Sequence, residues 1–136
     1  SSPSNDITDE LSSLVSDVNR VLQDDAGRWM LSAHHQDAQA ELALFVAEDQ
    51  RQIVVDRTFI DKQTGIRWII DYKTSRPAGE ASLSDFFSEE AARYRDQLIT
   101  YRSAMQRYDK SHHRDVVETR MALYFSALAV LHELPA

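Results

Sequence analysis

The sequence predicts an α/β domain in which a mixed sheet of four to five strands is flanked by helices. Two observations predict it. Segments 52–60 and 66–74 are rich in β-branched and aromatic residues, as strands are. A long helical pattern follows them, and strand patterns resume at 118–125 and 128–134. A length of 136 residues suits a single domain, and strands on both sides of a long helix are typical of a mixed α/β class.

The N-terminal part reads as a helix followed by the first strand. Apolar residues recur at spacings of 3 and 4 over 7–22, which predicts an amphipathic helix that residues 24–27 end. Residues 29–31 are expected to form a buried connector. Alternation from residue 40, through Leu42, Leu44 and Val46, predicts a strand before a turn at 47–50. We therefore divide the chain into a helix and connector, 1–28, and a core, 29–136.

The centre predicts a β-hairpin with a loop at 61–65. If the loop is centred near residue 63 or 64, the numbers of opposing residues add to about 127. After a break at 76–79, a long helix is expected to begin at Ser84 or Ser88 and to end near Tyr108. Residues 109–115 are expected to form a polar loop, and 118–125 and 128–134 the last strands.

Three charged residues of this hairpin form the candidate site. Asp71 and Lys73 share a strand face, and the expected register places Asp56 opposite Asp71. A register error of one residue would separate them. Opposed carboxylates destabilise a strand pair by up to ~1 kcal/mol, so a cation between them is favourable. Mg²⁺ often takes one or two carboxylates and substrate phosphate, so these residues predict a magnesium site.

The competing interpretation is a solvated surface pair, because an Asp-x-Lys triplet is common by chance. The apolar residues 68–70 before Asp71 favour an interior strand whose end reaches a cleft. On the long helix a stripe repeats at spacings of 3 and 4, and packing on the sheet explains most of it. A glutamine within such a stripe needs hydrogen-bond partners if it is buried. The stripe consists of Tyr94, Gln97, Tyr101, Met105 and Tyr108.

These motifs resemble a known family. Asp56-Arg57, the run from Trp68 through Asp71-Tyr72-Lys73 to Ser75, and the run Tyr94 to Tyr101 are similar to the nuclease domain of RecB/AddA-type helicase–nucleases. That family is a branch of the PD-(D/E)XK superfamily and is often fused behind a UvrD-like DNA helicase. The resemblance covers residues from about 29 to the C-terminus. It implies a restriction-endonuclease-like core.

The resemblance also implies an activity and its residues. It implies a Mg²⁺-dependent deoxyribonuclease of exonuclease type, with Mn²⁺ as a substitute metal, acting in DNA repair and recombination. Asp56 and Asp71 would bind the metal and Lys73 would be the catalytic lysine. Gln97 and Tyr101 match a Gln-x-x-x-Tyr motif near the site and the DNA strand. Glu41 falls where many members carry a glutamate.

The chain departs from the family in three ways. It has no glycine shortly before Asp56, and its absence of cysteine separates it from relatives with an iron–sulfur cluster. The family's metal-binding histidine lies on an upstream helix, and the predicted helix 7–22 contains none. We expect the five histidines to be surface or loop residues: His34, His35, His112, His113 and His132.

Composition limits the setting of the protein. Without cysteine there is no disulfide scaffold, no cysteine nucleophile and no cysteine metal site, which suits a reducing cytosol. No apolar stretch approaches the ~20 residues needed to cross a bilayer, so no membrane partner is expected. Since the chain does not begin with methionine, we expect a piece of a longer protein. The resemblance implies a UvrD-like helicase module in that protein and a cytoplasmic, nucleoid-associated location in bacteria.

Charge leaves the choice of partner open. The net charge is −7, yet residues 1–50 hold ten acidic and two basic side chains, while residues 51–136 hold twelve acidic and thirteen basic ones. An anionic ligand is thus disfavoured near the N-terminus and tolerated beyond it. The expected ligand is single-stranded or end-containing DNA. Two alternatives remain: a nuclease-like module that grips DNA or its helicase without cutting, and an α/β domain whose hairpin charges are only solvated.

Overall fold

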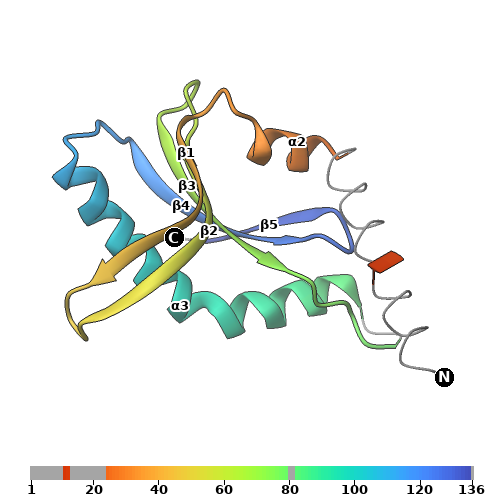
Figure 1. The fold of residues 1–136 in the computed structure, drawn as a ribbon. Coiled ribbons are helices and arrows are strands. Elements are labelled where there is room, and N and C mark those ends of the chain that lie inside the picture. The colour runs from red at the N-terminus through yellow and green to blue at the C-terminus, as the bar shows by residue number, and fades with distance from the viewer. Residues whose placement is uncertain (1–10, 13–23, 80–81, 136) are drawn as a thin grey trace.

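The structure, a computed structural model, describes residues 11–12, 24–79 and 82–135. They form an α/β domain with a five-stranded mixed sheet and a helix on each side (Figure 1). The elements are α2 (Asp25–Leu31), β1 (Gln36–Val46), β2 (Arg51–Ile60), β3 (Ile66–Lys73), α3 (Leu83–Ser111), β4 (Glu118–Phe125) and β5 (Val130–Leu134). The predicted α/β class, strand number and flanking helices are confirmed. Apart from Leu11 and Ser12, which are helical, the helix predicted over 7–22 lies outside the described residues.

The strands lie in the sheet in chain order. Neighbouring strands are antiparallel except β3 and β4, which are parallel. Parallel neighbours need a crossover of a dozen or more residues, and α3 supplies it. The long helix therefore has to run back along the strands that it connects, across one face of the sheet.

Each face of the sheet is covered by a different helix. Alternate residues of β3 point to opposite faces, so Ile69 packs on the side of α3, whereas Trp68 and Ile70 pack on the side of α2. All three are buried. Burial on both faces explains the continuous apolar run that the sequence shows there.

The segment that forms α2 differs from the prediction. Residues 25–31 form α2, where we expected the end of the first helix and a connector. Asp24 is its N-cap, because its side chain accepts a hydrogen bond of 2.9 Å from the Gly27 N–H. Met30 faces inward and is 1% exposed, so the expected burial of this segment is confirmed at that residue.

The long helix and the first strand are longer than predicted. α3 begins after Ser82, whose hydroxyl accepts from the Asp85 N–H, rather than at Ser84 or Ser88. It also continues beyond Tyr108 to Ser111. β1 begins at Gln36, because its polar first residues lack the alternation on which we relied and include a bulge. The remaining strands match their predicted bounds within two residues.

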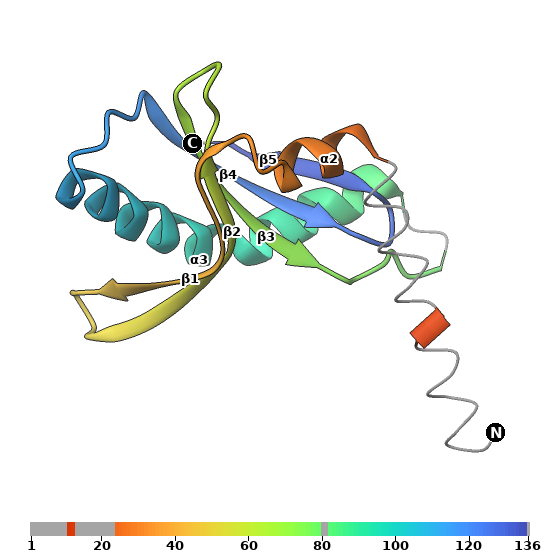
Figure 2. The ribbon, with the colours of Figure 1, turned by 45° about the horizontal axis from the view of Figure 1, so that its top comes forward.

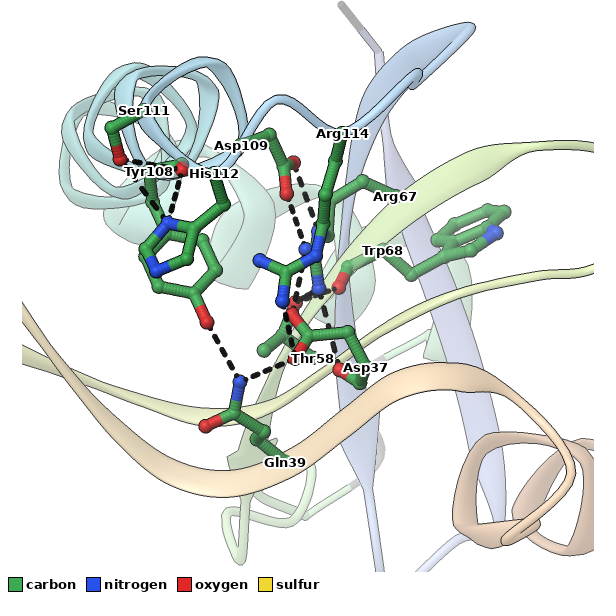
Figure 3. A network of polar contacts seen from close by, with 10 residues as sticks. All are labelled: Asp37, Gln39, Thr58, Arg67, Trp68, Tyr108, Asp109, Ser111, His112 and Arg114. Carbon is green, nitrogen blue, oxygen red and sulfur yellow. Dashed lines mark hydrogen bonds and ion pairs between the residues drawn. The ribbon is translucent and has the colours of Figure 1, made fainter.

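A buried ion-pair network fastens the C-terminal end of α3 to the sheet (Figure 3). The guanidinium of Arg67, on β3, is fully buried and pairs with Asp109 on α3 and with Asp37 on β1. It also lies within hydrogen-bond distance of the Thr58 hydroxyl on β2. Asp109 was predicted in a polar loop. That prediction was wrong, because a partner from 42 residues away neutralises the charge and lets the helix bury it.

The same network sets how α3 lies along β3. Arg67 meets Asp109, and Lys73 meets Tyr94. Six residues of strand span about 20 Å, and the fifteen residues of helix between these contacts span about 22 Å. The two elements therefore run antiparallel between these two contacts. No helix among the described residues is long and apolar enough to span a membrane.

Candidate functional site

The predicted hairpin register is confirmed. The Cα partners of β2 and β3 run from Ile60 opposite Arg67 to Arg57 opposite Ile70, and each pair of numbers adds to 127. Asp56 and Asp71 are the next residues on the two strands. Here the carboxylate of Asp56 accepts a 2.8 Å hydrogen bond from the Tyr72 backbone N–H. The β1–β2 hairpin turns away from β3 beyond the last ladder pair (Figure 2). The Asp56 side chain takes the place of the strand backbone there.

Asp71 lies beside Asp56 and is nearly buried, at 8% exposed. Burial, and after it a hydrogen bond with the Asp56 carboxylate, raise the pKa of Asp71 to about 6, although Lys73 opposes the shift. Asp71 Oδ2 lies 2.9 Å from Lys73 Nζ but lacks hydrogen-bond geometry to any group in the described structure. The structure therefore brings the two carboxylates and the ammonium together, as the sequence predicted.

Lys73 is held by a second contact. Its Nζ lies 3.5 Å from the centroid of the Tyr94 ring on α3, a cation–π distance. Burial works to lower the pKa of Lys73, but its close contact and charge interaction with Asp71 outweigh this effect and raise the pKa. The ammonium is therefore charged at neutral pH and close to a carboxylate.

The helical stripe divides into packing residues and exposed residues. Met105 is fully buried, and the Tyr108 hydroxyl accepts a hydrogen bond from Gln39. Gln97 is exposed, and its side-chain amide donates to the Tyr101 hydroxyl at 3.1 Å. The expected proximity of Gln97 and Tyr101 is confirmed. Gln97 needs no buried partner, because it faces solvent.

Glu41 does not join the carboxylates. It is exposed on β1 with a φ of 53°, and no three His, Cys, Asp or Glu side chains in the described part of the chain could hold a metal ion together. His34, His112 and His113 are exposed, as expected. His35 lies in a loop but stacks on Phe59, with ring centroids 4.0 Å apart. His132 was expected on the surface or in a loop, yet it lies half-buried on β5 against Phe87.

The carboxylate pair fits a hard divalent cation. Asp71 Oδ2 is buried without a hydrogen bond, and although Lys73 lies 2.9 Å from it, a second carboxylate adjoins the same group. A cation with oxygen ligands would satisfy that oxygen and relieve the repulsion between the two groups. With two protein carboxylates, several coordination positions would be left for water and substrate, as Mg²⁺ prefers.

Two residues on α3 were not singled out from the sequence as functional candidates, and one of them, Tyr94, contacts Lys73. Tyr94 was assigned to packing, because its helical spacing gives no sign of a lysine above its ring. Glu90 lies four residues earlier on the same helix face and is 7% exposed. Its Oε2 has no partner among the described residues, and Arg93 lies 3.8 Å from its other oxygen. The four-residue spacing from Tyr94 was the available signal for Glu90.

Neither the models of known protein families nor the curated proteins contain a match to this chain. The function is therefore inferred from the geometry of the site and from the motifs themselves.

Proposed function

We propose that this chain is a DNA nuclease domain of the RecB/AddA type, with a restriction-endonuclease-like core, and that it hydrolyses phosphodiester bonds within a helicase–nuclease. The observation that supports this proposal most is the meeting of Asp56, Asp71 and Lys73 at the point where β2 separates from β3. Two carboxylates and a lysine in one place are the residue types that metal-assisted phosphodiester hydrolysis needs.

Each residue has a role in the proposed reaction. Asp56 and Asp71 would hold Mg²⁺, which supplies a water of lowered pKa and neutralises charge on the phosphate when bound. Lys73 places a positive charge where negative charge develops on the phosphate oxygens. Gln97 presents an exposed amide on α3, hydrogen-bonded to the hydroxyl of the half-buried Tyr101, and the two can contact the DNA strand.

A cleavage assay with matched variants tests the proposal. The chain is incubated with 5′-labelled single-stranded DNA, with and without Mg²⁺. We expect Mg²⁺-dependent cleavage by the unmodified chain and a loss of at least about 100-fold in Asp71→Asn and Lys73→Met. Asp115→Asn and Lys62→Met, which alter exposed residues of the same types, are the controls. Equal cleavage in the site variants and their controls would contradict the proposal.

The alternative function is a module that binds DNA or its helicase without cutting. Its support is that no third metal-ligating side chain joins Asp56 and Asp71 within the described ranges. Such a module would bind single-stranded DNA in a gel-shift assay with the same affinity whether EDTA or Mg²⁺ is present, and would not degrade it. Cleavage that EDTA abolishes decides against it.

A further inference from the structure

The Tyr94 ring packs against the hydrophobic core, and its face also meets the Lys73 ammonium. We propose that Tyr94 is the positioning residue of Lys73: its ring face holds the ammonium next to Asp71, on the side of the sheet where the proposed reaction takes place. The inference extends the proposed function and depends on it for its kinetic consequence. The contact itself can be measured without any activity.

The contacts of Lys73 restrict an otherwise mobile group. A lysine side chain has four rotatable bonds and loses much rotamer entropy when it is held in one conformation. Here its Nζ lies 2.9 Å from Asp71 Oδ2 and 3.5 Å from the Tyr94 ring centroid. An ammonium held by a carboxylate and a ring face has far fewer conformations than one held by a carboxylate alone. The ring thus keeps Lys73 in place before a substrate arrives.

The part of α3 that carries Tyr94 is itself held to the sheet at several points. Toward the C-terminus of α3, Leu98 is fully buried and Asp109 is paired with Arg67. Toward the N-terminus, Phe86 packs on Phe125, with ring centroids 5.3 Å apart. Phe125 is the ladder partner of Lys73 on β4. Anchors on both sides of Tyr94 therefore hold its ring in register with Lys73.

The ring, and not the hydroxyl, makes the contact. The Tyr94 hydroxyl makes no hydrogen bond among the described residues, whereas the ring face meets the Lys73 ammonium. Phenylalanine keeps that face, and leucine keeps much of the apolar volume without it. Comparing Tyr94→Phe with Tyr94→Leu therefore separates a ring that positions Lys73 from a side chain that only fills space.

Proton NMR of the metal-free protein tests the contact. The chain has three lysines, and Lys62 and Lys110 are exposed, so their ε-methylene signals serve as internal references. A ring face shifts nearby protons upfield. We expect the Lys73 signal, assigned by its loss in Lys73→Met, to lie upfield in the unmodified chain and in Tyr94→Phe. In Tyr94→Leu it should coincide with the reference signals.

Kinetics under the cleavage assay test the consequence. We expect Tyr94→Leu to lower kcat about tenfold with KM unchanged, and Tyr94→Phe to restore kcat to nearly its original value. Thermal melting curves identify any loss of folded protein. A Lys73 signal that is not upfield in the unmodified chain overturns the inference, and so does an unchanged kcat in Tyr94→Leu.

The two proposals fail in different ways. If the unmodified chain cleaves no DNA, the proposed function is wrong, and the NMR comparison alone then decides whether Tyr94 positions Lys73. If the chain cleaves DNA but Tyr94→Leu and Tyr94→Phe behave alike in both measurements, the nuclease proposal stands and the role of Tyr94 is refuted.

Discussion

The two ends of β3 bury charge in opposite ways. At one end Arg67, fully buried, has two carboxylates and a hydroxyl around its guanidinium. At the other end Asp71, also buried, is paired with Lys73 but also adjoins a second carboxylate, and its Oδ2 has no hydrogen bond. A fully paired buried charge needs nothing from outside the chain. A buried carboxylate beside another carboxylate does, so the Asp71 end is where a ligand is expected and the Arg67 end is where the fold is fastened.

Removing Arg67 should have the largest effect on stability. Arg67→Met leaves the carboxylates of Asp37 and Asp109 buried without their common partner, which typically costs about 3–5 kcal/mol of unfolding free energy. Urea unfolding followed by circular dichroism measures the loss. The control is Arg107→Met, which breaks an exposed pair with Glu48 and should lower the unfolding free energy far less. Equal losses in the two variants would show that the buried network does not hold α3 to the sheet.

Neutralising Asp71 should raise the unfolding free energy, whereas removing Arg67 should lower it. The pKa of Asp71 is raised to about 6, which means that the fold disfavours its charged form. One pKa unit corresponds to about 1.4 kcal/mol and an unfolded aspartate has a pKa of about 3.9, so Asp71→Asn should stabilise the metal-free protein by about 2–3 kcal/mol at pH 7.5. Urea unfolding in EDTA measures it. A destabilised variant would show that Asp71 is a structural residue like Arg67.

The stability difference between Asp71→Asn and the unmodified chain should also depend on pH. The folded pKa of Asp71, about 6, exceeds that of an unfolded aspartate, about 3.9. The protonated carboxyl therefore contributes stability that is fully present below pH 4 and is lost as the pH rises through 6. The advantage of Asp71→Asn over the unmodified chain should grow between pH 4 and 7 and then level off. A constant advantage across this range would contradict the assigned cause.

The sequence predicted the hairpin end of the site better than the helix beside it. The register of β2 and β3 follows from loop length and alternation, both local properties, so Asp56, Asp71 and Lys73 could be brought together from the sequence alone. The contacts that α3 makes with the sheet could not be predicted in this way. The Arg67–Asp109 pair and the Tyr94–Lys73 contact join residues 42 and 21 positions apart, and no local periodicity reports them.

Local sequence patterns also failed to predict the structure of the polar segments at the edges of the fold. Asp109 looked like a loop residue until its buried partner was known. Gln36 and Asp37 lack an apolar alternation, yet they extend β1, where Asp37 reaches Arg67. In both places a long-range charge pair decides the structure of residues whose own propensity is for loops.

Magnesium binding by the metal-free chain tests the central claim most directly, without depending on any choice of DNA substrate. Isothermal titration calorimetry with MgCl₂ should give a saturable binding event for the unmodified chain and for Asp115→Asn, an exposed control. The same event should be lost in Asp71→Asn. Binding of equal strength in all three proteins, or the absence of saturable binding in the unmodified chain, would contradict the assignment of Asp56 and Asp71 as the cation site.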